Sequence, residues 1–143
     1  MGTLTQKFIV TRKISRLDSE GKPVLVRVGK PRKVSVSEWE CAFHISNIGM
    51  DEINYGLGID GLQALIQAIE GVRVFLEKSG YEFSWDGGEE GDTGIPRYVP
   101  TFYGKNFTEH LYKLIDSEIE LFAQSAERKY ASEKESVDDA DDH

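Results

Sequence analysis

Residues 53–80, INYGLGIDGLQALIQAIEGVRVFLEKSG, contain a change from strand to helix periodicity. Ile53, Tyr55 and Leu57 alternate with their neighbours, which is typical of a strand with one buried face. From residue 61 onward the apolar residues recur at helical spacing, and this predicts an amphipathic helix over 61–79. The stripe expected to face the core consists of Leu62, Leu65, Ile66, Ile69, Val72 and Leu76.

Both ends of this predicted helix carry recognisable capping signals. Asp60 is placed as the N-cap, and Gln63, three residues later, completes a capping box. Gly80 provides a left-handed stop at the other end. Gly61 and Gly71 each weaken a helix by about 1 kcal/mol relative to Ala, and Gly71 suggests a close approach to the sheet.

Three further strands precede this unit, each with period two. Their expected inward sets are Phe8, Val10 and Ile14; then Val24, Val26 and Val28; and then Trp39, Cys41, Phe43 and Ile45. A turn over 17–23 joins the first two into a hairpin, and residues 29–33 interrupt the pattern before the third.

Beyond the helix, Tyr81, Phe83 and Trp85 indicate a fifth strand, followed by a glycine-rich, charged loop over 86–96. A second capping box, Asn106 with Glu109, opens a long helix over 107–130. Its expected apolar stripe consists of Phe107, Leu111, Leu114, Ile115, Ile119, Phe122 and Ala126.

These elements predict an α+β fold, in which an antiparallel meander of about five strands packs against one amphipathic helix and a long C-terminal helix follows. A chain of 143 residues has the usual size of one domain, here 1–131. Residues 132–143 carry six acidic side chains against Lys134. We expect this acidic tail to be disordered, because it cannot bury enough apolar surface.

The net charge of −8 is distributed unevenly along the chain. Residues 1–33 hold nine Lys and Arg against two acidic residues, a net charge of +7, so the other 110 residues carry −15. The protein is therefore expected to be bipolar, with a basic N-terminal hairpin and an acidic remainder.

The composition also restricts the cellular setting. No apolar run approaches the roughly 18 residues that span a bilayer, and the N-terminus does not resemble a secretory signal. Cys41 is the only cysteine, which fits a reducing compartment. We expect a cytoplasmic protein without a membrane partner.

The residue types that carry most chemistries are sparse. Cys41 and His44 are three apart on one strand, so their side chains point to opposite faces and cannot act as nucleophile and base. No pair of cysteines or histidines has zinc-ligand spacing, and the sequence predicts no cofactor and no metal site.

The glycine-rich loop contains four carboxylates, Asp86, Glu89, Glu90 and Asp92. Clustered oxygens are what a hard cation needs, so a ligand or metal site that these carboxylates form with His44 or Tyr98 is one interpretation. The other is a solvated acidic turn, because the spacing does not match an EF-hand loop.

Five cations of the basic hairpin are candidate binding residues: Arg12, Arg16, Arg27, Lys30 and Arg32. Such a cluster can contact phosphates, or it can guard an exposed edge strand. Because the acidic remainder would repel a long polyanion, a protein partner or a second copy of the chain fits better than nucleic acid.

The chain resembles a family of small uncharacterised bacterial proteins that share a domain of unknown function. The resemblance covers about residues 5–96. It is carried by Gly29-Lys30-Pro31, by Trp39, Cys41 and Phe43, by Gly58, Asp60, Gln63, Ala64, Leu65 and Ala68, and by Gly91-Asp92-Thr93-Gly94-Ile95-Pro96. It implies a bacterial cytoplasmic setting and no particular activity.

Taken together, these features predict a small protein-binding or regulatory module, immunity-like and without catalytic activity. It would use charge complementarity and the aromatic stretch from Tyr98 through Tyr103 to Phe107. The alternatives are a ligand- or metal-binding protein or enzyme that uses loop 86–96, and nucleic-acid binding through the basic hairpin. The long apolar stripe over 107–130 also predicts a homodimer.

Overall fold

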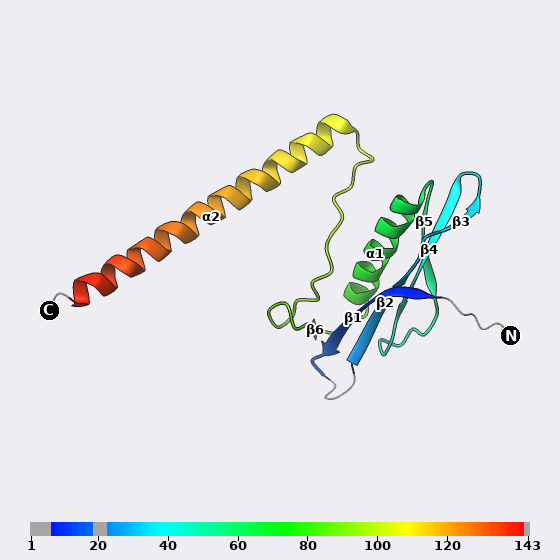
Figure 1. The fold of residues 1–143 in the computed structure, drawn as a ribbon, viewed down its shortest axis with the longest axis horizontal. Coiled ribbons are helices and arrows are strands. Elements are labelled where there is room, and N and C mark those ends of the chain that lie inside the picture. Colours follow the sequence, from blue (N-terminus) through cyan, green and yellow to red (C-terminus); the bar gives the residue numbers. More distant parts are fainter. Residues whose placement is uncertain (1–6, 19–22, 142–143) are drawn as a thin grey trace. The chain divides into compact units, whose positions relative to one another are not determined.

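The computed structural model describes residues 7–18 and 23–141 and divides the chain into two compact units. Unit 1 is Met1–Tyr98 and unit 2 is Val99–His143. The class is α+β, as predicted: six strands and one helix belong to unit 1, and one long helix to unit 2 (Figure 1). The domain predicted over 1–131 thus spans both units.

The sheet of unit 1 is antiparallel throughout. Its strands are β1 (Phe8–Arg16), β2 (Pro23–Gly29), β3 (Arg32–Ser35), β4 (Glu38–Ile45), β5 (Asn54–Gly58) and β6 (Phe83–Ser84). β4 pairs with β2, β3 and β5, and β1 pairs with β2 and β6. The predicted meander is confirmed, and β3 is one strand more than was expected because the chain resumes pairing after the break at Pro31, which has no N–H to donate.

The predicted alternation holds best in β2 and β4. Val24, Val26 and Val28 are buried, as are Cys41, Phe43 and Ile45. β1 departs from the prediction, since Ile14 is buried but Val10 is exposed. A register shift between Phe8 and Val10 interrupts the alternation, and the Phe8 ring lies 6.2 Å from the ring of His44.

β5 turns the opposite face to the core from the one predicted. Gly56 is buried, whereas the side chains of Tyr55 and Leu57 are exposed. The reason is the close approach of α1 (Gly61–Lys78), which covers this face of the sheet (Figure 1). A Cβ atom on Gly56 would lie 2.7 Å from the Ala68 Cα, and one on Gly58 would lie 2.6 Å from the Ala64 N.

The same close approach corrects the predicted stripe of α1. Its fully buried residues are Ala64, Ala68, Val72 and Leu76, so small side chains face β5. Leu62 is 68% exposed, and Ile66 and Ile69 are half-buried on a flank of the helix. Gly71 lies against the sheet as suggested, since a Cβ there would lie 2.7 Å from the Phe43 ring.

The predicted ends of α1 are confirmed. The Gln63 N–H donates to Asp60 Oδ1 at 2.8 Å, and the Ile59 N–H donates to Gln63 Oε1 at 2.7 Å. The first bond is the N-cap bond of a capping box, whereas Gln63 accepts from the residue before the N-cap and not from the Asp60 N–H. After the helix, Gly80 has a φ of +78°, the left-handed conformation that favours glycine.

The helix of unit 2, α2 (Lys105–Asp141), is longer than the predicted 107–130. It begins earlier because the Thr108 N–H donates to the carbonyl of Gly104, whose φ is +104°. Asn106 therefore lies inside the first turn and is not the predicted N-cap. The structure also places residues 132–141 in the helix, where the composition indicated a disordered tail, and residues 142–143 of that tail lie outside the described residues.

Within the residues that the structure describes, no helix is long and apolar enough to cross a membrane.

Candidate interaction surfaces

Arg12 and Arg16, two of the predicted binding cations, lie on the packing side of β1. The Arg12 guanidinium stacks 3.9 Å above the Trp85 ring and donates to the Gly94 carbonyl at 2.7 Å. Arg16 stacks 3.7 Å above Tyr81 and donates to Asp18 and to the Asn47 carbonyl. Both side chains therefore hold the segment that follows α1 against the sheet.

The remaining cations of the hairpin do not form one patch with these two. Arg32 is paired with Glu40 across β3 and β4. Arg27 is half-buried opposite His44, and Lys30 is exposed. The charge asymmetry of the sequence is thus smaller at the surface, because part of the positive charge is already used inside unit 1.

The glycine-rich loop is wrapped around Trp85. A Cβ atom added to either Gly87 or Gly94 would lie 2.6 Å from Cζ2 of the Trp85 indole and nearer still to another ring atom, so only glycine permits this packing. Asp92 Oδ1 accepts the Gly94 N–H at 2.8 Å and shapes the turn. The glycines that suggested a ligand loop therefore enclose a tryptophan.

The four carboxylates of this loop, Asp86, Glu89, Glu90 and Asp92, are all exposed. Within residues 7–18 and 23–141, no group of three or more His, Cys, Asp or Glu side chains is placed to hold a metal ion. Their expected convergence on one site with Tyr98 is not seen in the described structure.

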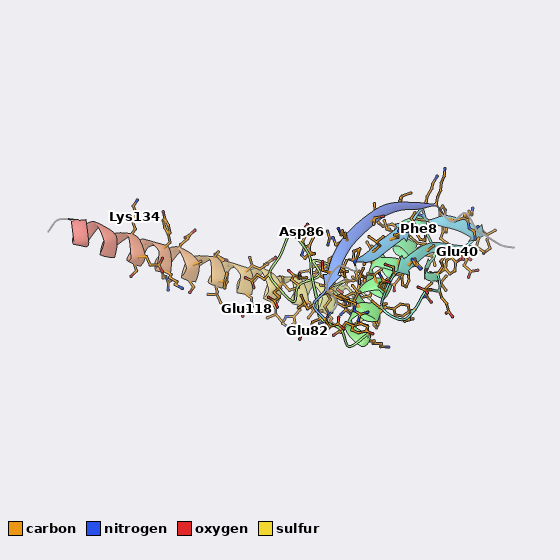
Figure 2. All side chains as sticks on the ribbon, turned by 90° about the horizontal axis from the view of Figure 1, so that it is seen from below. Phe8, Glu40, Glu82, Asp86, Glu118 and Lys134 are labelled. Carbon is orange, nitrogen blue, oxygen red and sulfur yellow. The ribbon has the colours of Figure 1, made fainter. Side chains whose placement is uncertain are left out.

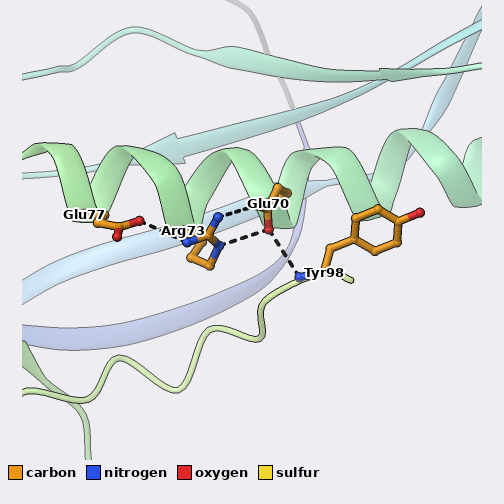
Figure 3. A network of polar contacts seen from close by, with 4 residues as sticks. All are labelled: Glu70, Arg73, Glu77 and Tyr98. Atoms are coloured by element: carbon orange, nitrogen blue, oxygen red, sulfur yellow. Dashed lines mark hydrogen bonds and ion pairs between the residues drawn. The ribbon is translucent and has the colours of Figure 1, made fainter. Parts of the chain in front are cut away.

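A polar network connects the outer flank of α1 with Tyr98 (Figure 3). Glu70 accepts hydrogen bonds from the Arg73 guanidinium and, at 3.3 Å, from the Tyr98 N–H, while Arg73 also reaches Glu77 at 3.0 Å. The bonds from Arg73 lower the pKa of Glu70, against a partial burial that raises it, and the Tyr98 N–H adds to the lowering.

Next to this network is a shallow pocket of about 190 Å³. It is lined by Ile66, Ile69, Glu70, Pro96, Arg97 and Tyr98. Ile66 and Ile69, which the sequence assigned to the core side of α1, thus line this pocket. The Glu70 carboxylate already accepts hydrogen bonds from Arg73 and from the Tyr98 N–H.

Cys41 and His44 lie apart, as their spacing indicated. The Cys41 thiol is buried beside the Gly29 carbonyl, 3.3 Å away, and burial raises its pKa. His44 lies on the opposite face of β4, where its Nε2 is 3.1 Å from the Asp51 carbonyl oxygen. Neither residue faces the other.

Unit 2 presents a chain of aromatic rings at the beginning of α2. The Phe102 and Tyr103 rings are 4.2 Å apart, and Tyr103 lies 5.9 Å from Phe107. Phe107 in turn lies 6.4 Å from His110. We call these four residues the aromatic cluster; Phe102 is 75% exposed. Tyr103 was a predicted binding residue, whereas Phe102 and His110 were not singled out.

Along α2, the predicted apolar stripe is exposed except at Leu111, which is half-buried. Its side chains project from a helix that packs against no other helix or strand of unit 2 (Figure 2). The large apolar residues that remain exposed are Phe107, Tyr112, Leu114, Ile115, Ile119, Leu121, Phe122 and Tyr130. Helical periodicity indicated this stripe, but periodicity cannot show whether a stripe is covered.

Unit 1 therefore defines a class of small α+β domain, an antiparallel meander covered on one face by a single helix packed through glycine and alanine. The model of a family described as Domain of unknown function (DUF6968) matches residues 10–97, and the chain belongs to this family. Searches of curated proteins and of solved structures each found no match.

The residues on which the resemblance rested have packing roles in unit 1. Gly58 leaves space for the backbone of Ala64 in α1, and Gly61 lies against Trp39 and Pro31. Asp60 and Gln63 cap the helix. The family match ends at residue 97, one residue before unit 1 ends, so α2 lies outside it.

Proposed function

We propose that this chain is a small protein-binding, regulatory module of the bacterial cytoplasm, and that unit 2 carries the binding surface. The observation that carries the proposal is the exposed apolar stripe of α2 together with the aromatic cluster at its beginning. Contiguous apolar surface of this kind is typical of interaction sites on soluble proteins.

The composition of the surface supports a protein as its ligand. Binding energy in protein interfaces concentrates in aromatic anchors that become fully desolvated, and the aromatic cluster offers three such rings near one another. An amphipathic helix that lays its apolar face into a partner's groove is a common recognition mode. The polar side of α2, with Lys113, Glu120 and Gln124, keeps the unbound helix hydrated.

Unit 1 contributes a folded platform in this proposal. Arg12 and Arg16 are engaged within the unit. Charge complementarity therefore rests on the cations that stay exposed, among them Lys13, Lys30 and Lys33, and on the carboxylates of the loop around Trp85. Such rim charges change association rates more than affinity.

The test compares two variants with the same change in charge. The stripe variant carries Ile115→Glu, Ile119→Glu and Phe122→Glu. The control variant carries Lys113→Glu and Gln124→Glu on the polar side. Glutamate is a good helix former, so both keep the helix intact.

We expect a stoichiometric protein partner, either another protein or an untagged second copy of the chain, to co-purify from the native lysate with the wild type and the control variant, and to be lost from the stripe variant. A partner retained equally by all three proteins would contradict the assignment of the surface. A tightly bound small molecule in place of any protein would contradict the proposal itself.

A further inference from the structure

We propose that the partner of the α2 stripe is the α2 stripe of a second copy of this chain, paired antiparallel. This inference rests on the proposed function and names the partner for the same surface. It is carried by the length of the stripe, by the order of large and small residues along it, and by the position of its charges.

The stripe is large enough for a stable dimer. From Phe107 to Tyr130 it extends for about 36 Å, at 1.5 Å per residue. Six of the large apolar side chains exposed on α2 lie on the stripe side of the helix, and Leu114 and Leu121 lie away from it. The six are Phe107, Tyr112, Ile115, Ile119, Phe122 and Tyr130. If each loses roughly 100 Å² on pairing, each copy buries about 600 Å² and the pair about 1,200 Å², which is the lower end of specific interfaces.

The spacing of the stripe also suits a second long helix. Leu111, Ile115, Ile119 and Phe122 follow steps of 4, 4 and 3 residues. Such an eleven-residue repeat averages about 3.67 residues per turn, close to a straight α-helix, so the stripe drifts little around the axis. Two such helices can stay in contact over the whole stripe.

Residue size favours the antiparallel orientation. The stripe begins with large residues and continues into Ala123 and Ala126. Centring an antiparallel pair between residues 118 and 119 brings Leu111 level with Ala126 of the second copy and Ile115 level with Phe122. At the Leu111 level a large side chain then meets a small one, whereas a parallel pair would set Leu111 against Leu111 and Ala126 against Ala126.

Charge favours the same orientation. The last residues of α2 include Glu135, Asp138, Asp139 and Asp141. A parallel pair would set the two acidic ends side by side, which is destabilising. An antiparallel pair separates them by the length of the shared stripe, well beyond the screening length of about 8 Å at physiological salt.

The stripe helix also needs a partner to be stable. Its only described ion pair, Lys105 with Glu109, is long at 3.9 Å. Most helical stability in proteins comes from packing an apolar face. A second copy supplies that packing to both helices at once.

Sedimentation equilibrium of the full chain tests the pairing. We expect about twice the monomer mass of 16.1 kDa at micromolar concentration for the wild type and the control variant, and the monomer mass for the stripe variant. Far-ultraviolet circular dichroism checks that α2 stays helical in the variants, and tryptophan fluorescence checks unit 1, where Trp39 and Trp85 both lie.

Orientation is tested by single cysteines in a Cys41→Ser background. Glu118→Cys lies near the centre of the antiparallel pair and should form an inter-chain disulfide readily, whereas Ala126→Cys should not. Cross-linking at both positions would indicate a parallel pair and overturn the orientation.

A monomeric wild type at about 100 μM would overturn the pairing. If that monomer still loses a different protein partner in the stripe variant, the proposed function stands and only the second copy is wrong. If the stripe variant equals the wild type in mass and in partner binding, both proposals fail.

Discussion

Arg12 occupies a position on the packing side of β1 where an unpartnered charge would be costly. Its guanidinium is instead placed between the Trp85 ring and the carbonyl of Gly94. A planar guanidinium can stack and donate in its own plane at the same time, which an ammonium cannot do. Arg12 thus connects the first strand to the loop that follows β6.

We predict that Arg12→Lys lowers the free energy of unfolding by about 1–2 kcal/mol, because it loses the stack and a hydrogen bond. Urea denaturation followed by tryptophan fluorescence measures this. Lys13→Ala, exposed on the opposite face of β1, is the control and should change stability by less than about 0.5 kcal/mol. Equal effects of the two changes would show that the stack contributes nothing.

Gly56 is required for a different reason, the space it leaves for α1. A Cβ atom there would lie 2.7 Å from the Ala68 Cα, and backbone cannot move aside as a flexible side chain can. We predict that Gly56→Ala costs about 3 kcal/mol or more, at the upper end of overpacking effects. Leu57→Ala, in the same strand but 56% exposed, is the matched control and should cost under about 1 kcal/mol. A Gly56→Ala protein as stable as the wild type would mean that the helix does not sit this close.

At the scale of single elements, α1 depends on its N-terminal cap. Asp60 Oδ1 satisfies the Gln63 N–H, one of the donors that a helix leaves unpaired at its beginning. We predict that Asp60→Ala destabilises unit 1 by about 1 kcal/mol, while Asp60→Ser keeps most of the stability. The midpoints of thermal unfolding of the three proteins check this, and an equal loss in both variants would show that the carboxylate acts by something other than capping.

The Glu70 network should make the stability of unit 1 depend on pH. Since the pKa of Glu70 is lowered in the folded state, its contribution is complete above the ordinary glutamate pKa of about 4.3 and is lost as the pH falls through the lower, folded-state value. We predict that Glu70→Gln costs about 1 kcal/mol at pH 7 and much less at pH 3. Urea midpoints from pH 3 to 7 measure the difference. Glu77→Gln, which removes the more exposed partner of Arg73, is the control; a pH-independent cost for Glu70→Gln would rule out the mechanism.

The sequence predicted the position and the ends of helices and strands better than it predicted which face of each one is buried. The ends of α1 follow from local chemistry at Asp60, Gln63 and Gly80, and local chemistry can be read directly. Its buried face could not be read in this way, because Ala64 and Ala68 face the core only where Gly56 lets the helix approach. That constraint comes from another strand.

The candidate site residues illustrate the same limit. A charge pattern indicated one basic surface, yet Arg12 and Arg16 each have an aromatic partner about 70 residues away in sequence. The glycines around Asp92 suggested a loop that binds a ligand, but in the structure they make room for the side chain of Trp85. A single sequence carries no signal for such long-range pairs.

At the scale of the whole molecule, the chain joins two units that differ in how they are stabilised. Unit 1 has its own core and includes the full family match. Unit 2 is one helix with the aromatic cluster at its beginning. Both tryptophans lie in unit 1, so tryptophan fluorescence follows that unit alone, whereas far-ultraviolet circular dichroism follows both.

This difference predicts that residues 1–98 fold without unit 2. The Tyr98 N–H that bonds to Glu70 is retained in such a fragment, and a unit with its own core can fold independently. The proper reference is the full-length stripe variant, because self-association would otherwise add to the apparent stability of the wild type. We expect the two proteins to unfold cooperatively by tryptophan fluorescence, with free energies of unfolding within about 1 kcal/mol of each other. A fragment that unfolds without a cooperative transition would show that unit 1 requires contacts from α2, and that the helix is part of the domain's core and not an arm for binding.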